Sequence, residues 1–357
     1  MPETPIPSLS KKLLTNKGAV LGMILIIVNV LLAVFAYVLA PDISPNANRM
    51  IPEIGSKKPG FHMLFLQKRR ESTKTGNIFN TLLNGKEEEY EYIPITGYQQ
   101  RGDSIVYQRY LDEGVSEQKA LPLSAIATPL TVTKTFYLGT DKFGRDILSR
   151  LIIGTRVSLG VGLIAVIISL TIGVLLGALA GYYGKWIDDV ISWLINVVWT
   201  IPTLLLVFAI TLALGKGFWQ VFIAVGLTMW VNVARLVRGQ VMAIKELEYI
   251  QATKALGYSD MRTIVRHILP NIAGPIIVIA ASNFASAIVI EAGLSFLGVG
   301  VQPPQPSWGL MIKENYNFII THNPMLALAP GIAIILLVLA FNLLGNGLRD
   351  ALSTKNR

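Results

Sequence analysis

The chain has 357 residues, of which 52% are hydrophobic and only 15% are charged, and its formal net charge is +9. This apolar content is higher than that of an ordinary soluble domain and is typical of a chain that crosses a membrane several times. The positive charge is spread over loops, with no basic stripe and no interleaved aromatic residues, which argues against nucleic-acid binding. Because the sequence has no cysteine, disulfides, thiolate metal sites and cysteine nucleophiles are excluded.

The amino-terminal region combines a polar segment, residues 1–18, with a long apolar run, residues 19–40. The apolar core of a secretory signal peptide has about 7 to 15 residues, whereas a membrane-spanning helix needs about 20. We therefore interpret 19–40 as the first transmembrane helix. Lys11, Lys12 and Lys17 precede it, so residues 1–18 are expected on the cytoplasmic side.

Residues 41–135 contain no apolar run long enough to span a membrane, which indicates a soluble insertion outside the membrane. Two stretches rich in aromatic and β-branched residues, 90–95 and 105–110, flank Gly102 and Asp103. This pattern predicts a β-hairpin and hence a β-rich subdomain. Only one hairpin signal is visible, so a partly ordered loop is the alternative.

Five further apolar stretches follow the insertion. They lie at about 158–181, 190–214, 218–236, 272–294 and 325–344. The first of them carries Gly173, Gly177 and Gly181 at intervals of four residues. Small residues repeated on one face of a helix permit close packing against a neighbouring helix in lipid.

Four residues in these stretches are candidates for a translocation pathway or its outer gate. Pro202 stands near the middle of 190–214 and predicts a kink, which in a transporter would line the pathway and otherwise only shapes the bundle. Ser282 and Asn283 lie within 272–294, and Glu291 lies near the end of that stretch. An ionisable residue inside a membrane segment is a functional candidate by default, and a structural role at the helix ends is the alternative.

Residues 246–271 form the only long polar interval in the second half of the chain. Gly257 is placed to end a first short helix in a left-handed conformation. Ser259 and Asp260 can then cap a second helix that ends at Pro270. The apolar residues are expected to face a groove on a partner, unless the segment is only an amphipathic connector. They are Leu247, Ile250, Leu256, Met261 and Ile264.

The sequence of this segment, Glu-Tyr-Ile-Gln-Ala-Thr-Lys-Ala-Leu-Gly at 248–257 followed by Arg-His-Ile-Leu-Pro-Asn at 266–271, resembles the Glu-Ala-Ala (EAA) loop of ABC importer permeases. The variant is that of the dipeptide, oligopeptide and nickel permease family. Two positions depart from it, since Gln251 replaces the usual Glu and Thr253 replaces the second Ala. The resemblance implies that the segment couples to an ATPase through Glu248, Gln251, Ala252, Leu256, Gly257, His267 and Pro270.

A second resemblance to the same family lies just before the second apolar stretch, at residues 138–150. The family pattern there is Leu-Gly-Thr-Asp, then Gly-Arg-Asp, then Ser-Arg. It is carried here by Gly139, Thr140, Asp141, Gly144, Arg145 and Asp146, among others. A catalytic pair formed by Asp141 and Asp146 is disfavoured, because no His, metal partner or third acid accompanies them.

The distribution of Lys and Arg agrees with the expected topology of six spans. With the amino end inside, alternation places 41–135 outside and both 246–271 and the tail 353–357 inside. Six basic residues surround or occupy the central loop, whereas Lys216 and Lys313 stand alone in the two outer loops. The six are Arg235, Arg238, Lys245, Lys254, Arg262 and Arg266.

The resemblance implies an all-α polytopic membrane protein with six transmembrane helices, the type I permease fold of ABC importers, in which 136–352 forms the permease domain. It also implies a second homologous permease subunit, two ABC ATPase subunits, an extracytoplasmic solute-binding protein and a location in the cell inner membrane. The sequence itself lacks a phosphate-binding loop, so we expect no catalysis and no cofactor on this chain. ATP and Mg would be bound by the ATPase partners.

The implied function is ATP-driven import, with di- or oligopeptides as the expected cargo. Nickel complexes or a peptide antibiotic are alternative cargoes for the same machinery. A different class of function is a membrane-anchored structural or sensory protein that acts through residues 42–135. Deleting the insertion should abolish that second function, while changing Gly257 should not. An integral membrane hydrolase is disfavoured by the absence of a Ser-His-Asp or metal constellation.

Overall fold

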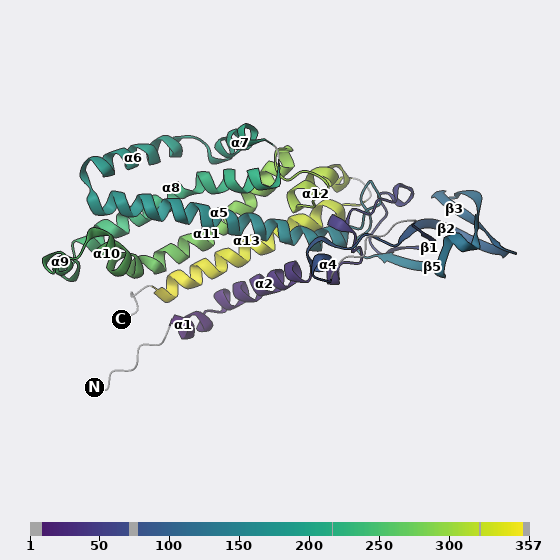
Figure 1. The fold of residues 1–357 in the computed structure, drawn as a ribbon, viewed down its shortest axis with the longest axis horizontal. Coiled ribbons are helices and arrows are strands. Elements are labelled where there is room, and N and C mark those ends of the chain that lie inside the picture. Colours follow the sequence, from purple (N-terminus) through teal and green to yellow (C-terminus); the bar gives the residue numbers. More distant parts are fainter. Residues whose placement is uncertain (1–8, 71–77, 216, 321–322, 353–357) are drawn as a thin grey trace. The chain divides into compact units, whose positions relative to one another are not determined.

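The computed structural model describes residues 9–70, 78–215, 217–320 and 323–352 (Figure 1). The tail 353–357 and the first part of the predicted cytoplasmic segment 1–18 lie outside the described residues. The chain divides into two compact units. Unit 1 comprises residues 1–30, 158–302 and 334–357, and unit 2 comprises 31–157 and 303–333.

All five strands lie between α3 and α5, with α4 among them, and the rest of the described chain is helical or irregular. The helices are α1 (Leu9–Thr15), α2 (Lys17–Val34), α3 (Ala36–Leu39), α4 (Ile78–Asn84), α5 (Ile147–Tyr183), α6 (Lys185–Thr200), α7 (Thr203–Leu214), α8 (Phe218–Lys245), α9 (Glu248–Ala255), α10 (Asp260–Thr263), α11 (Ala273–Leu297), α12 (Trp308–Asn315) and α13 (Met325–Leu352). The strands are β1 (Phe61–Arg69), β2 (Tyr90–Arg101), β3 (Ser104–Asp112), β4 (Val115–Pro122) and β5 (Ile126–Phe136).

Five helices in the described part of the chain are long and apolar enough to cross a membrane. A sixth crossing is reached only if α6 and α7 count as one broken span, because they are bent by 94°. The kink predicted at Pro202 is thus a full break. Ile201 is extended at the end of α6, since a residue before proline avoids the helical conformation and proline offers no N–H to continue the helix.

The prediction that a helix ends at Pro270 is wrong. α10 continues through a π-helical turn, Ile264–Ile268, and a 3-10 turn, Leu269–Ile272, into α11. Proline removes one regular backbone hydrogen bond, and the altered winding around it accommodates that loss without stopping the chain. The second helix of the polar segment is therefore continuous with a membrane-spanning helix.

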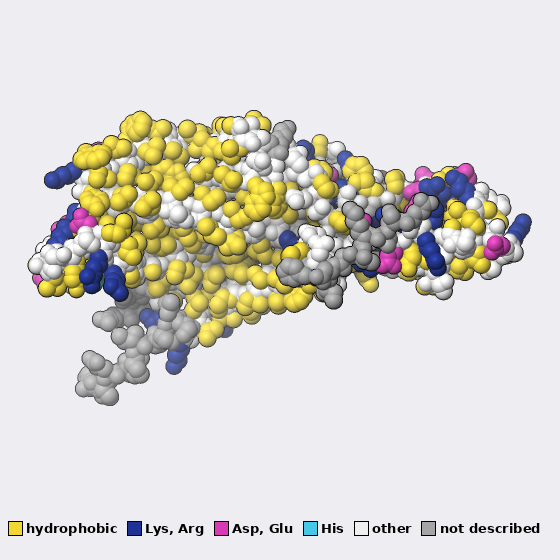
Figure 2. Space-filling model, in the orientation of Figure 1, with side chains coloured by type: hydrophobic (Ala, Val, Ile, Leu, Met, Phe, Trp, Pro, Cys, Tyr) yellow, Lys and Arg dark blue, Asp and Glu magenta, His cyan; other side chains and the backbone are white. Residues whose placement is uncertain are grey.

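Close backbone approach holds α5 against α8 in unit 1. A Cβ added at Gly177 would lie 2.5 Å from the carbonyl oxygen of Ala234, and one at Gly173 would lie 2.5 Å from the Cβ of Val233. This confirms that the predicted glycine stripe permits close helix packing. α11 and α13 meet through the stacked rings of Phe284 and Phe341, whose centroids are 3.9 Å apart. Hydrophobic side chains cover the visible face of the long helices, as a lipid-facing surface requires (Figure 2).

The insertion in unit 2 is a five-stranded antiparallel sheet with the strand order β4-β3-β2-β1-β5. The predicted hairpin is confirmed: β2 and β3 are joined by a turn in which Gly102 has φ +59°. One hydrophobic cluster of the sheet joins Phe65 and Phe136 to Ile51 and Ile54, which precede β1. The β-rich subdomain expected from the sequence is therefore present, and it contains more strands than the single hairpin signal indicated.

Candidate functional site

The α9 helix presents most of the predicted ATPase-contact residues on one face. Glu248, Gln251 and Ala252 are exposed, and so is Leu256 at the end of the helix. Residues three and four apart lie on the same side of an α-helix, so these four side chains form a single surface. Gln251 Nε2 also donates a hydrogen bond of 3.3 Å to the carbonyl oxygen of Glu246, which an ionised Glu at that position could not do.

The opposite face of α9 is buried in unit 1. Ile250 is fully buried and packs with Ile264, Ile268 and Val241 in one hydrophobic cluster. Thr253 Oγ1 lies 3.1 Å from Thr263 Oγ1. The expectation that Ile250 and Ile264 face a partner is therefore wrong, because both belong to the core that anchors the loop to the helices.

The bend after α9 has the geometry predicted from its glycine. Gly257 has φ +74°, which confirms the predicted left-handed conformation. Its N–H bonds to Lys254 O at 2.9 Å, and the N–H of Tyr258 bonds to Thr253 O at 3.0 Å. This pair of bonds is the Schellman motif, which closes a helix by satisfying its last carbonyls. Ser259 caps α10 by accepting a hydrogen bond of 3.4 Å from Arg262 N–H.

The remaining two predicted contact residues lie beyond the bend. His267 stacks on Tyr258, with ring centroids 5.7 Å apart, and so ties the two sides of the bend together. Pro270 is exposed in the 3-10 turn before α11. We call the exposed residues around the bend the α9 surface. Its apolar members are Leu247, Leu256, Met261 and Val265, and its basic members are Lys254, Arg262 and Arg266.

The motif at 139–146 folds as a tight loop in unit 2. Gly139 and Gly144 have φ values of +80° and +73°, and a Cβ at Gly144 would lie 1.8 Å from the carbonyl oxygen of Ile51. Thr140 fixes the loop by accepting a hydrogen bond of 2.9 Å from Lys57 N–H. Only glycine fits where the two chain segments approach so closely, so both glycines are required by the backbone.

The acidic residues of this loop are used internally. Asp141 is fully buried and accepts hydrogen bonds from the backbone N–H groups of Phe143 and Arg145, at 2.9 and 3.0 Å, and from Arg145 Nε at 2.6 Å. Asp146 accepts a bond of 2.8 Å from Ser149 N–H at the start of α5. Burial raises the pKa of the Asp146 carboxyl, and its hydrogen bonds with Ser149 oppose that shift. The two carboxylates thus cap and brace the loop.

A buried ionic network extends from this loop to α12. Arg145 Nη2 lies 2.8 Å from Glu314 Oε2, and Arg150 Nη2 lies 3.2 Å from the same oxygen. The three side chains are 2%, 1% and 13% exposed for Arg145, Arg150 and Glu314. This network could not be predicted from the sequence, because Glu314 lies 169 residues from Arg145 and 164 from Arg150.

The four predicted pathway residues have different surroundings. Asn283 is buried and its Nδ2 lies 3.4 Å from Ser169 Oγ, and Glu291 is fully buried and accepts a hydrogen bond of 2.6 Å from Ser295 Oγ. The Asn283 contact therefore joins α11 to α5, whereas the Glu291 bond lies within α11. Pro202 separates α6 from α7. Ser282 lies on an open face of α11 and lines a cavity.

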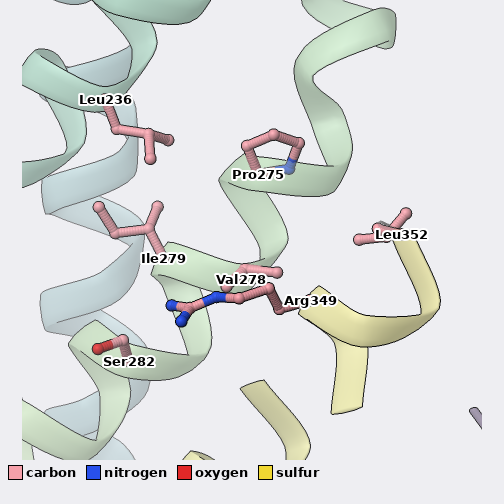
Figure 3. A pocket seen from close by; sticks show the side chains of 7 residues that line it. All are labelled: Leu236, Pro275, Val278, Ile279, Ser282, Arg349 and Leu352. Carbon is pink, nitrogen blue, oxygen red and sulfur yellow. The ribbon is translucent and has the colours of Figure 1, made fainter. Parts of the chain in front are cut away.

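That cavity has a volume of about 480 Å³ and lies between α8, α11 and α13 of unit 1 (Figure 3). It is lined by Leu236, Pro275, Val278, Ile279, Ser282, Arg349 and Leu352. Arg349 is its one charged residue, and its guanidinium extends from α13 across to α11, toward Ile279 and Ser282 (Figure 3). We call this the Arg349 cavity. Arg349 lies beyond the last apolar stretch predicted from the sequence, about 325–344, and was not predicted as a site residue.

A second cavity of about 230 Å³ lies beside the break between α6 and α7. Ile201 and Thr203, the neighbours of Pro202, contribute to its wall. The polar side chains in the wall include Thr228 and Asn232 of α8 and Ser286 of α11, one helical turn from Ser282. No group of three or more His, Asp or Glu side chains that could hold a metal ion occurs in the described part of the chain.

Two family models match the sequence. Residues 173–357 match the family described as "Binding-protein-dependent transport system inner membrane component". Residues 9–52 match the one described as "N-terminal TM domain of oligopeptide transport permease C". The first match contains α9, the bend and the residues of the Arg349 cavity, whereas the sheet lies between the two matches.

Similar proteins include three named permeases. The glutathione transport system permease protein GsiD of Pectobacterium atrosepticum is 43% identical over 219 residues, which are 61% of this chain and 72% of that one. The dipeptide transport system permease protein DppC of Alkalihalophilus pseudofirmus is 45% identical with the same coverage. The oligopeptide transport system permease protein OppC of Bacillus subtilis is 38% identical over 225 residues, 63% of this chain and 73% of that one. Among solved structures, an inward-facing methionine ABC transporter MetNI chain is 18% identical, with a TM-score of 0.48, over 58% of this chain and 98% of that one.

Proposed function

Since the chain belongs to the family of binding-protein-dependent transport system inner membrane components, we propose that it is the permease subunit of an ABC importer for di- or oligopeptides. The similar permeases are named for glutathione, dipeptide and oligopeptide transport, and all three cargoes are short peptides. Five helices suited to crossing a membrane, with a sixth if the bent pair is counted, agree with a membrane-embedded transport subunit.

The observation that carries the coupling part of the proposal is the construction of α9. The α9 surface offers Leu256, 71% exposed at the end of α9, and Met261, 62% exposed in α10, beside basic side chains. Apolar anchors within a charged rim are suited to an apolar groove with acidic edges on an ATPase subunit. Glu248, Gln251, Ala252 and Leu256 would contact that groove, while Gly257, His267 and Pro270 shape the bend.

The buried side of α9 supplies the mechanical link. Ile250 packs against residues of α8 and of the segment leading into α11. Tyr182, near the end of α5, donates a hydrogen bond of 2.7 Å to Asp260 Oδ1. When ATP draws the ATPase subunits together, a displacement of α9 would be passed to three membrane helices as packed bodies. ATP can drive this change only by favouring one of the two states of the importer.

The proposed assembly contains a second homologous permease, two ABC ATPase subunits that bind ATP and Mg, and an extracytoplasmic solute-binding protein. The chain itself would perform no catalysis. It would lie in the inner membrane among lipids, with both termini and the loop 246–271 in the cytoplasm and the insertion 41–135 outside. In this arrangement the loop 139–146 stabilises the outer part of the permease, and Ser282 faces the translocation pathway.

The test uses the complete importer with Gly257→Val in this chain. At φ +74° a β-branched residue is strained by about 1–2 kcal/mol, although no atom lies within 4 Å of the added Cβ. Gly114→Val is the control, because Gly114 has a similar φ of +77°, is equally uncrowded and lies in the turn between β3 and β4 of unit 2. We expect Gly257→Val to reduce both co-purification of the ATPase subunits and peptide uptake into proteoliposomes, and Gly114→Val to retain both.

Two results would contradict the proposal. If the wild-type chain does not co-purify with an ATPase subunit, α9 does not have the proposed coupling role. Wild-type importer that binds its ATPases but shows no ATP-dependent uptake of any di- or oligopeptide would remove the cargo assignment. Equal losses in both valine variants would show that strain in a turn, rather than the position at α9, determines the effect.

A further inference from the structure

The Arg349 cavity contains a basic side chain that has no acidic neighbour among the described residues lining it. Arg238 in α8 is paired, with Nη2 2.6 Å from Asp188 Oδ2, and Arg235 stacks over the ring of Trp199 at 3.4 Å. Arg349 has no comparable ion pair or ring contact among the residues that the structure describes. The Arg349 side chain is exposed at the cavity, and no acidic side chain is among the residues that line it, so its guanidinium is open to an anionic group.

The size and the walls of the cavity restrict that anion. A volume of about 480 Å³ lies in the range of sites that take small organic ligands. Most of the wall is apolar. Besides Arg349, the polar residue that lines the cavity is Ser282, toward which the guanidinium extends (Figure 3). The matching ligand therefore carries one anionic group for the guanidinium and apolar side chains for the wall.

The polar groups farther along α11 separate two sources of such a ligand. Ser286, one turn beyond Ser282, lies in the wall of the second cavity together with Thr203, Thr228 and Asn232. The hydroxyl and amide side chains of this second cavity match the N–H and C=O groups of a peptide backbone. The acyl chain of a lipid cannot form hydrogen bonds with them. The walls of the two cavities together thus favour a peptide that extends along α11 from Ser282 to Ser286 over an anionic lipid.

We propose that Arg349 binds the carboxyl-terminal carboxylate of a short peptide inside the Arg349 cavity, with Ser282 as a second donor and the apolar wall accepting peptide side chains. This inference rests on the proposed function and adds a site to it. A guanidinium presents two parallel N–H donors to a carboxylate, which gives orientation as well as affinity. Peptides without a free carboxylate would then bind weakly at this point.

The experiment measures binding to the purified complex of permeases and ATPases in nanodiscs, without the solute-binding protein, whose own selectivity would otherwise dominate. The probes are L-alanyl-L-phenylalanine and its carboxamide. Each is tested against wild type, Arg349→Gln, Arg349→Lys and Ser282→Ala. Lys185→Gln is the charge-matched control, since Lys185 begins α6, is exposed and is absent from the cavity wall.

We expect the wild type to bind the free acid about 10-fold to 100-fold more tightly than the amide, as charge-assisted hydrogen bonds imply. Arg349→Gln should abolish this ratio, Arg349→Lys should retain part of it because the charge remains without the planar fork, and Ser282→Ala should reduce it slightly. Lys185→Gln should leave it unchanged. A ratio is informative here because a general loss of folded protein would weaken both probes alike.

Several results would overturn the inference. The first is that the wild type binds the free acid and the carboxamide equally tightly. The second is that Arg349→Gln keeps the preference for the free acid. Adding phosphatidylglycerol to phosphatidylcholine nanodiscs could displace the dipeptide from the wild type and not from Arg349→Gln, which would identify a lipid site instead. Peptide uptake with the solute-binding protein is measured in parallel. If uptake is present while the ratio fails, only the Arg349 site is lost. If uptake is absent, the proposed function fails with it.

Discussion

The buried ion pairs of Glu314 with Arg145 and Arg150 are expected to contribute to the stability of unit 2. Glu314→Gln would leave Arg150, whose side chain is 1% exposed, without the carboxylate that it contacts at 3.2 Å. Removing one partner of a buried ion pair typically costs about 3–5 kcal/mol, because the other charge stays buried. We expect a clearly lower melting temperature of the purified protein, measured by differential scanning calorimetry in detergent.

The control for this prediction is an ion pair in the same unit whose carboxylate is exposed. Lys57 Nζ lies 3.1 Å from Glu113 Oε1, but the Glu113 side chain is 85% exposed, so Glu113→Gln should change stability by less than about 1 kcal/mol. Adding Arg150→Met to Glu314→Gln should recover part of the loss, since no unmatched charge then remains on α5. Equal effects of Glu113→Gln and Glu314→Gln would show that burial of the network contributes nothing.

At the scale of elements, the packing of α5 on α8 depends on the glycine stripe. Gly177→Ala would place a Cβ 2.5 Å from Ala234 O, so the two helices would have to separate. Overpacking of this kind costs about 1–3 kcal/mol. Gly160→Ala, on the same helix, would meet only Phe222 Cε2 at 3.9 Å and should be tolerated. Thermal unfolding of the two variants in detergent measures the difference, and similar melting temperatures would contradict a close α5–α8 contact.

The elements that the sequence predicts best are those specified locally. The turn at Gly102, the left-handed Gly257 and the glycine stripe each follow from residues within one or two helical turns or one hairpin. β4 was missed although it follows β3 in a hairpin, because its sequence, Val-Ser-Glu-Gln-Lys-Ala-Leu-Pro, has few β-branched and no aromatic residues. β1 and β5 were missed because their pairing joins distant segments: Phe61 lies opposite Phe136. Contacts of that kind leave no periodic signal in either segment.

Two further misses have the same cause in the polar segment. Amphipathicity identified Ile250 and Ile264 as members of an apolar face, but it could not show that this face meets the protein's own helices. Pro270 predicted a helix end, and the structure keeps the chain helical through a π-helical turn at Ile264–Ile268. Local propensity is overridden where tertiary packing holds both sides of the distortion.

At the scale of the whole molecule, the sheet of the insertion and the elements proposed to act in transport occupy different parts of the chain, so the sheet can be removed without removing them. The sheet falls outside both family matches, and the aligned residues cover a smaller share of this chain than of its relatives, so this chain is the longer one. The α9 surface and the Arg349 cavity lie entirely in unit 1. Neither includes a residue of the sheet.

Replacing residues 64–133 with Asn-Gly should therefore preserve ATPase association and peptide uptake. Met63 and Lys134 are opposed in the antiparallel pair of β1 and β5, so a two-residue turn can join them. Phe61, Met63 and Phe136 remain to cover part of Ile54. Co-purification and proteoliposome uptake are compared with the full chain and with Gly257→Val. If the shortened chain binds its ATPases but no longer imports peptide, the sheet takes a direct part in transport. If Gly257→Val imports peptide and the shortened chain does not, the insertion rather than α9 is responsible for the function.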